Sequence, residues 1–506
     1  MSRSLRRDYR SRVPRAFRLE YADVQTVIDS GAQDVSWVSQ ELDGVELSDK
    51  RLDRRLIKSA QQLAASPTSP INEACGDWSS TQATYRLFDN IKVTPQKLLE
   101  PHRQETLKRM RSCEGPVLSV QDTVLITYKQ HAKTQGLGPV GYSNSPEGRG
   151  LIMHHALAFT TDGVPLGLLS QTIWARPQVS EESYQERIER LQLTAIEKKE
   201  SFKWLVALQE TVRCTPPGVK VITVADRESD FFEFITAAKD LRARYVIRAR
   251  SDRFLVPEDS DGAGRTSEAI GAAAVIGTLS VEIPSNGKRQ ARTASVAVRI
   301  ARVTLKPPPR RGQAKLTGSQ EPVSVNVIAA IEENAPVGIE PISWVLLTNE
   351  LVKDFDSAAE KIQWYGGRWG IETWHKVLKA GCKVEDCRLE QAERLKRHLA
   401  LFSIISVRLM YVTYLARVKP DLPATAAFSA EELEALHVRA TRTLPPSKPP
   451  TLREAVHLIG RMGGHLGRKC DGEPGVTVLW RGWLRLHEDV AILRAHKEAL
   501  GLINSS

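Results

Sequence analysis

The sequence predicts a mixed α/β protein with helical regions at both ends. Between residues 117 and 224, short apolar runs alternate with a helical region, which is the pattern of a mixed α/β core. Residues 251–341 instead carry β-branched side chains at alternating positions, and residues 31–100 and 452–503 follow helical patterns. At roughly 150 residues per domain, the chain is long enough for about three domains. The predicted division is a basic arm at 1–30, a helical domain at 31–110, an α/β domain at 111–390 and a helical domain at 391–506.

Composition is that of an ordinary soluble globular protein. Hydrophobic residues make up 41% and charged residues 26% of the 506 residues, which excludes a disordered or collagen-like chain. Six cysteines are too few for a disulfide scaffold, so we expect a reducing cytoplasm, and Cys382 and Cys387 are interpreted as ordinary buried thiols. The most apolar stretch, 399–407, ends at Arg408, well short of the roughly 20 residues that cross a bilayer. We therefore expect no membrane partner.

Positive charge is concentrated at the amino terminus. The formal net charge is +11, and residues 1–18, with seven Arg and one Asp, hold +6 of it. This arm has no apolar segment of a secretory signal, and it lacks the evident cleavage pattern of a transit peptide. A nucleic-acid-binding arm and a solvated tail both stay open.

The first strong helical pattern, at 47–63, has an apolar and a basic face. Ser48 is the predicted N-cap, and the buried stripe is formed by Leu47, Leu52, Leu56 and Leu63. The other face carries Lys50, Arg51, Arg54, Arg55 and Lys58. Such a face is usually solvated surface, but five cations within nine residues favour phosphate contacts. We therefore expect this helix to bind DNA.

The α/β region is predicted from three strands and one helical segment. Residues 117–120, 151–159 and 219–224 are apolar or β-branched runs bounded by Gly and Pro, and residues 180–212 read as helical. The β-rich block 251–341 is interpreted as an insertion into this region and not as a separate domain.

Prolines and glycines mark where the remaining loops and helices begin and end. Loops are expected at 261–265 and around Arg310 and Arg311, where prolines and glycines cluster. The stretch from 357 to about 417 reads as helical with one break, at Gly381. Prolines after it bracket a further helix and mark the start of the last helical domain.

Three acidic residues lie where an active site is expected. Asp122 is predicted to follow the strand at 117–120, and Asp226 to follow the strand at 219–224. Ligands of α/β sheets gather at the carboxyl ends of strands, so both acids are well placed. Glu372 lies on a helical run at 363–379.

That run is predicted to be one helix with a polar stripe. At about 100° per residue, four polar side chains fall within about 60° of one another. They are Tyr365, Arg368, Glu372 and Lys379. Gly366 and Gly367 are poor helix formers and would need a reason, such as the close approach of a partner backbone.

The stripe matches, at every position, a signature of one family. Tyr365-x2-Arg368-x3-Glu372-x6-Lys379 resembles the Tyr-(2)-Arg-(3)-Glu-(6)-Lys motif of transposases of the insertion-sequence-four family, in the transposon-five-type, cut-and-paste branch. Residues 121–123 and 225–230 resemble its first and second acid motifs, and 343–348 the strand before its third acid. Residues 36–87 resemble its DNA-binding domain, and 463–486 a tail segment of its members.

The resemblance implies a ribonuclease-H-like catalytic core with the β insertion between its second and third acids. It implies that Asp122, Asp226 and Glu372 are the catalytic acids and metal ligands. Three carboxylates at one site repel each other unless cations lie between them, and hard Mg²⁺ or Mn²⁺ ions suit oxygen ligands. We expect two ions per active site, which would support phosphodiester hydrolysis and strand transfer, with a hairpin intermediate as the family implies.

The resemblance also implies DNA contacts and a dimer. Arg368 and Lys379 would bind phosphates, Tyr365 would bond to the same backbone, and Trp344 would stack on an extruded base. A buried strand aromatic is the alternative for Trp344. The expected partners are the terminal inverted repeats, target DNA and a second copy of the chain, which would pair through residues 390–506 in a synaptic complex.

Three functions stay open at this point. An active transposase of the bacterial cytoplasm, associated with the nucleoid when bound to DNA, accounts for the complete acid set. A catalytically silent DNA-binding regulator and a metal-dependent nuclease that never joins strands are the alternatives. Four further candidates are expected to be supporting residues and not ligands: Glu228, Asp230, His154 and His155.

Overall fold

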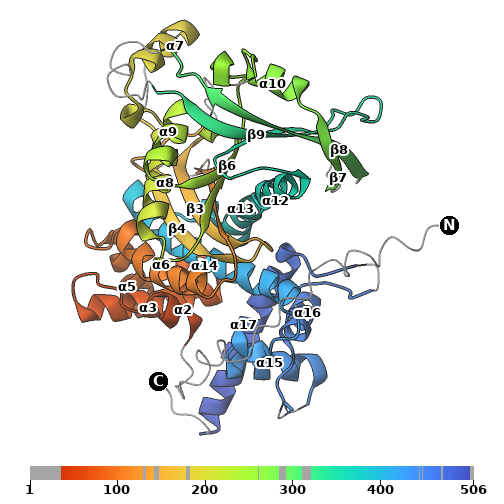
Figure 1. Ribbon diagram of the computed structural model, residues 1–506. Helices are drawn as coiled ribbons and strands as arrows, with labels where there is room; N and C mark the ends of the chain where they lie inside the picture. Colours follow the sequence, from red (N-terminus) through yellow and green to blue (C-terminus); the bar gives the residue numbers. More distant parts are fainter. Residues whose placement is uncertain are drawn as a thin grey trace, which may run out of the picture.

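The centre of the molecule is a mixed β-sheet. The computed structural model describes residues 36–128, 133–141, 148–177, 183–259, 261–283, 292–309, 321–443, 445–446, 448–468 and 471–501. Within these residues ten strands form one sheet in the order β2-β3-β1-β5-β6-β10-β9-β8-β7, with β4 paired to β3 (Figure 1). The strands are β1 (Val117–Thr127), β2 (Gly138–Pro139), β3 (Arg149–Thr160), β4 (Pro165–Trp174), β5 (Val221–Ala225), β6 (Arg244–Arg248), β7 (Val275–Ile283), β8 (Arg292–Leu305), β9 (Val323–Ile331) and β10 (Ser343–Thr348).

Strand β1 carries the first predicted acid. It pairs antiparallel with β3 along its whole length and parallel with β5 over Val117–Val120. The three predicted strands are confirmed, but β1 runs on to Thr127, because the residues after Asp122 are β-branched or apolar and keep pairing with β3. The expectation that Asp122 follows the strand is therefore wrong, since Asp122 lies inside it, opposite His155.

The predicted β-rich insertion extends this same sheet. Strands β7, β8 and β9 pair antiparallel in sequence order, and β10 joins β9 to β6. The block thus adds strands to the core sheet, as the sequence indicates, although it also contains helix α10 (Thr266–Ala272). The predicted loop residues Arg310 and Arg311 lie outside the described residues.

Helices cover both faces of the sheet beside β1. The predicted helical segment at 180–212 divides into α7 (Tyr184–Leu193) and α8 (Phe202–Cys214), and α9 (Phe232–Asp240) follows β5. Successive strand residues point to opposite faces. His154 packs edge-on against Trp204 of α8, whereas His155 packs edge-on against Trp374 of α13 (Trp369–Lys376), so these two helices lie on opposite faces.

The prediction of a single helix over residues 363–379 is wrong. Helix α12 (Phe355–Gly366) ends at the glycine pair, α13 begins after Arg368, and Val377–Gly381 forms a wider π turn. The backbone N–H of Arg368 donates to Tyr365, which tightens the chain at the break. A Cβ on Gly366 would meet open space within the chain, whereas one on Gly367 would lie 3.4 Å from Leu118 Cδ1 of β1, so the pair marks the break and its second glycine lies close to the sheet.

Short helices cover the amino-terminal side and share the core of the sheet. They are α2 (Trp37–Glu41), α3 (Lys50–Ala65), α4 (Ile71–Cys75), α5 (Trp78–Asp89) and α6 (Pro95–Arg111). Helix α3 buries Leu52, Leu56 and Leu63 as predicted. Its N-cap is Asp49 and not Ser48, because the Asp49 carboxylate accepts the N–H groups of Arg51 and Leu52.

Helix α14 (Ala392–Val418) joins the sheet to the carboxy-terminal helices, α15 (Ala430–Thr441), α16 (Leu452–Met462) and α17 (Val476–Ala499). These helices and the amino-terminal ones form two groups on the side of the molecule away from β7 and β8 (Figure 1). By length and composition, α14 is the helix among the described residues that could cross a membrane, but 83% of its apolar window is buried inside the fold. We therefore interpret α14 as a core helix.

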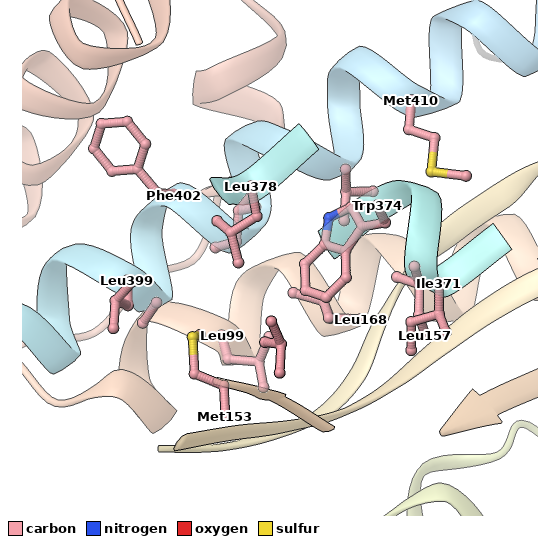
Figure 2. Packing of buried hydrophobic residues seen from close by; sticks show 14 of the residues in the cluster. Leu99, Met153, Leu157, Leu168, Ile371, Trp374, Leu378, Leu399, Phe402 and Met410 are labelled. Atoms are coloured by element: carbon pink, nitrogen blue, oxygen red, sulfur yellow. The ribbon is translucent and has the colours of Figure 1, made fainter. Parts of the chain in front are cut away.

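The core between α13, α14 and the sheet is tightly apolar. Figure 2 shows Ile371 and Trp374 of α13, with Leu378 of the following π turn, between the strands on one side and α14 on the other. The strand residues are Met153, Leu157 and Leu168, and the α14 residues are Leu399, Phe402 and Met410. Trp374 is fully buried there, so the helix that carries Glu372 is fixed by its own opposite face.

A close crossing holds α16 to α17. A Cβ on Gly482 would lie 1.8 Å from the carbonyl oxygen of Ile459, and one on Gly463 would lie 1.8 Å from that of Val478. Only glycine allows this approach of the two backbones.

Candidate active site and nucleic-acid interface

Asp122 is a half-buried carboxylate on β1, between β3 and β5. Its side chain is 16% exposed, and Oδ1 accepts the backbone N–H of Thr123 at 2.8 Å. Burial raises the pKa of Asp122 from 3.8 to about 7, and the nearby charges of Asp226 and Glu372 add to the rise. The Arg368 guanidinium opposes it. The three predicted acids therefore lie close enough to influence one another.

Asp226 directly follows β5, as predicted. It caps the short 3-10 turn Arg227–Ser229 by accepting the N–H of Glu228 at 2.9 Å. Burial raises the pKa of Asp226, and the charge of Glu228 adds to this effect. The carboxyl end of β5 thus brings the second acid beside the first, since β1 and β5 are parallel neighbours.

Glu372 and Arg368 complete the acidic site from α13. Arg368 Nη2 donates to Glu372 Oε1 at 2.6 Å, and Nη1 lies 3.8 Å from Asp122 Oδ2. The Arg368 side chain is only 10% exposed, so the guanidinium is held between two of the three acids. An interaction of this kind, buried on one side and shared, is stronger than a surface ion pair.

Aromatic rings lie beside Arg368. Tyr365 is buried and packs edge-on against Trp344 of β10, with ring centroids 5.8 Å apart, while Trp344 keeps partial exposure. The Arg368 guanidinium lies 5.4 Å from the ring of Trp369, which is 56% exposed. Trp369 was missed by the sequence reasoning, although it directly follows Arg368 in the motif. An exposed indole beside a guanidinium is suited to stacking on a base.

Lys379 lies farther along, in the π turn. Its Nζ donates to the carbonyl oxygen of Leu125 at 3.0 Å and lies 3.1 Å from Glu385. Glu385 in turn accepts the N–H of Thr127 at 2.7 Å. Lys379 borders a cavity of about 930 Å³ that is also lined by residues 67–72 and Tyr85 of the amino-terminal helices. Lys379 and the amino-terminal helices thus line the same cavity.

The α3 basic face is exposed as expected. Arg51, Arg54 and Lys58 are exposed and Arg55 is partly buried, and within the described part of the chain no ion pair engages any of the three arginines. On the neighbouring helix, Trp78 is 73% exposed and directly follows Asp77, which lies within the electrostatic reach of Lys58. Trp78 is a second candidate that the sequence reasoning missed. Unpaired arginines on α3 and an exposed indole on the neighbouring helix both suit a nucleic acid.

The four expected supporting residues are placed outside the acid triad itself. Asp230 is buried and accepts from Arg253 Nε at 2.9 Å and from the N–H of Arg250 at 2.7 Å. Glu228 accepts from Lys203 at 3.3 Å. His154 and His155 are buried in β3, and Thr123 Oγ1 lies 2.9 Å from His154 Nδ1.

Two basic groups near the acids were also missed. The nearly buried ammonium of Lys203 lies 5.8 Å from the ring of Trp204. Its positive charge opposes the rise in the pKa of Asp226 that burial causes. His375 Nδ1 lies 3.8 Å from Asp122 Oδ2, and burial lowers the pKa of His375 to about 3, so the ring is neutral. Its spacing of three residues from Glu372, one helical turn, was the available signal.

The donor set fits a hard divalent cation. All three acids offer oxygen, and burial, which raises the pKa of Asp122, leaves this carboxylate poorly solvated, so a bound cation would stabilise its charged form. In the described part of the chain, however, no three His, Cys, Asp or Glu side chains lie close enough to hold an ion as they stand. Arg368 lies between Asp122 and Glu372 instead.

Two segments match known protein families. Residues 34–93 match the family model described as Transposase DNA-binding, which covers α2 to α5 and the α3 basic face. Residues 404–498 match the family model described as Transposase Tn5 dimerisation domain, which begins inside α14 and ends in α17. The two matches flank the sheet that carries the acids.

Proposed function

We propose that this protein is a cut-and-paste DNA transposase that acts as a homodimer on its element ends. The chain carries the DNA-binding and dimerisation domains of Tn5-like transposases. The observation that carries the proposal is the meeting of Asp122, Asp226 and Glu372 around Arg368. The sheet supports the ribonuclease-H-like core implied by the resemblance. It pairs three antiparallel strands, β4, β3 and β1, with two parallel ones, β5 and β6, and carries its acids on β1 and after β5.

Asp122, Asp226 and Glu372 would hold two Mg²⁺ or Mn²⁺ ions. When bound, such ions activate a water or a 3′-hydroxyl and stabilise the leaving oxygen of a phosphodiester. Glu372 is the most exposed of the acids beside Arg368, with 38% of its side chain exposed, so it is the acid best able to turn toward the others. Arg368 then becomes available for a DNA phosphate, which is the role that the resemblance implies.

The remaining residues bind and orient the DNA. The α3 arginines Arg51, Arg54 and Arg55 supply contacts to the element end, and Lys379 to a phosphate near the cut. Trp344, braced by Tyr365, provides an aromatic face for an extruded base in a hairpin intermediate, and stacking of this kind contributes about 1–3 kcal/mol. The carboxy-terminal domain pairs two copies in a synaptic complex, and the freed 3′ ends then join the target.

A cleavage and strand-transfer assay tests the proposal. The full chain is incubated with Mg²⁺ and a duplex that carries the DNA flanking its reading frame. We expect double-strand cuts at matched inverted repeats, a hairpin product on denaturing gels, and joining to a target plasmid.

Matched variants decide among the alternatives. Glu372→Gln should abolish cleavage but keep DNA binding, whereas Glu360→Gln, an exposed glutamate of α12, should cleave normally. Cleavage by Glu372→Gln would refute the site assignment. Cleavage without joining would indicate a nuclease, and binding without cleavage by the unaltered chain would indicate a regulator.

A further inference from the structure

His375 is a buried imidazole that faces a catalytic carboxylate. It is 7% exposed, and its Nδ1 lies 3.8 Å from Asp122 Oδ2. Its other nitrogen, Nε2, is buried and finds no hydrogen-bond partner among the described residues. A buried polar atom without a partner costs about 1–3 kcal/mol, and an apolar ring of similar size would avoid this cost. Packing alone therefore does not explain a histidine here.

The two oxygens of Asp122 are held differently. Oδ1 accepts the N–H of Thr123 at 2.8 Å, which fixes one side of the carboxylate. Oδ2 has Arg368 Nη1 and His375 Nδ1 as neighbours, each at 3.8 Å. This is longer than a hydrogen bond but within reach of one, and catalytic hydrogen bonds are often long before substrate binds. Oδ2 is therefore the oxygen whose direction His375 can set.

The His375 ring is itself held from behind. His155 stands opposite Asp122 in the β1–β3 register, so both side chains point to the same face of the sheet. The His155 ring lies 5.5 Å from that of His375 and 4.6 Å from that of Trp374. Its Nε2 lies 3.0 Å from Gln171 Nε2, which also contacts Ser403 Oγ of α14 at 2.6 Å. His155 thus fills the space into which the His375 ring would otherwise turn.

We propose that His375 is a positioning residue, which donates a hydrogen bond from Nδ1 to Asp122 Oδ2 and so aims this oxygen at the divalent cations. The proposal deepens the proposed function and rests on it. His375 contacts no DNA and no reacting atom in this arrangement. It acts through Asp122, as the outer partners of metal-binding carboxylates do.

Three substitutions in the full chain test this role. His375→Phe keeps the ring volume and removes both nitrogens, and His375→Asn keeps a donor near the Nδ1 position. His398→Phe is the matched control, because His398 is also a buried histidine with an unpartnered Nδ1, yet it packs on Phe402 and, among the described residues, forms no ion pair with a carboxylate. Each protein is measured for thermal unfolding, for Mn²⁺ binding by the loss of the free-ion paramagnetic resonance signal, and for the Mg²⁺ concentration that gives half-maximal cleavage.

The expected pattern separates positioning from packing. His375→Phe should unfold at the wild-type temperature or above, yet bind Mn²⁺ about 10–100-fold more weakly and need correspondingly more Mg²⁺. His375→Asn should recover most of the Mn²⁺ affinity even where it unfolds at a lower temperature. His398→Phe should keep the wild-type Mn²⁺ affinity.

Several outcomes would overturn the inference. They are wild-type Mn²⁺ affinity in folded His375→Phe, no recovery in His375→Asn, and an equal loss in His398→Phe. Asp122→Asn distinguishes this failure from that of the proposed function. If Asp122→Asn binds Mn²⁺ and cleaves like the wild type, the metal site itself is wrongly assigned.

Discussion

The substitution Asp122→Asn should make the metal-free protein more stable above neutral pH. The carboxylate is buried in β1, and burial raises its pKa from 3.8 to about 7. The native state therefore keeps a proton in a pH range in which the unfolded chain has released it. Stability falls as the pH rises through this range, because the unfolded state binds fewer protons there than the native state.

The magnitude follows from the two pKa values. Each pH unit between them costs about 1.36 kcal/mol, so the difference between 3.8 and about 7 corresponds to roughly 4 kcal/mol in total. Between about pH 5 and pH 8 the wild type should lose about 3 kcal/mol of this contribution relative to the variant, because asparagine has no proton to release.

Urea unfolding in a chelating buffer, followed by tryptophan fluorescence at several pH values, measures this difference. The control is Asp162→Asn, an exposed carboxylate in the turn between β3 and β4, which should parallel the wild type at every pH. A wild-type and Asp122→Asn pair whose stabilities stay parallel from pH 5 to pH 8 would show that Asp122 ionises normally. Burial would then not control the ionisation of this carboxylate.

Three further predictions concern DNA binding and the carboxy-terminal helices. Replacing the three α3 arginines by Ala should reduce the slope of log affinity for DNA against log salt concentration by roughly 3, at about 0.9 per lost phosphate contact. Fluorescence anisotropy at several salt concentrations measures this slope, and an unchanged slope would remove α3 from the interface. Deleting residues 2–18, which lie outside the described residues, should lower DNA affinity and flatten its salt dependence but leave Mg²⁺-dependent cleavage intact; equal slopes with and without the arm would identify it as a solvated tail. Gly482→Ala should destabilise the packing of α16 on α17 by about 1–3 kcal/mol, because the new Cβ would meet the Ile459 carbonyl. Sedimentation velocity should show a weaker dimer. A variant with the wild-type unfolding temperature and dimer affinity would mean that the two helices move apart without cost.

Much of the fold follows from local patterns in the sequence. The strands β1, β3 and β5 and the insertion that extends their sheet are readable because β-branched and apolar runs alternate with turn residues. The extent of β1 is less readable, since Gln121, Asp122 and Thr123 look like a strand end. Only the pairing with β3, a tertiary property, keeps these residues extended.

The break in the predicted helix has a different cause. Periodicity continues through Gly366 and Gly367, so a count of 100° per residue passes over the change of direction. The glycine pair was the signal for this break, and the approach of a partner backbone at these glycines stays a prediction. Tyr365 therefore lies in α12 and packs on Trp344, while Glu372 lies in α13, with Arg368 at the N-cap of that helix.

The candidate site was predictable in its residues but not in its electrostatics. The acids could be named from their places after strands and from the matched motif. The sharing of Arg368 between Asp122 and Glu372 depends on how α13 packs on β1, which the sequence does not encode locally. For the same reason Lys203 was found only when distant segments were brought together, whereas Trp369 and His375 lie beside the motif in the sequence and could have been named from it.

Helix α14 constrains the order in which the molecule can assemble. It packs against β4 and α6, and its apolar face completes the core that the amino-terminal helices and the sheet share. On a ribosome, every strand of that sheet is made before this helix emerges. The nascent chain therefore holds an uncovered apolar surface until residue 418 is made, and a chain stopped earlier leaves that surface exposed to aggregation. A fragment truncated before Ala392 should thus be insoluble even though it contains all three acids.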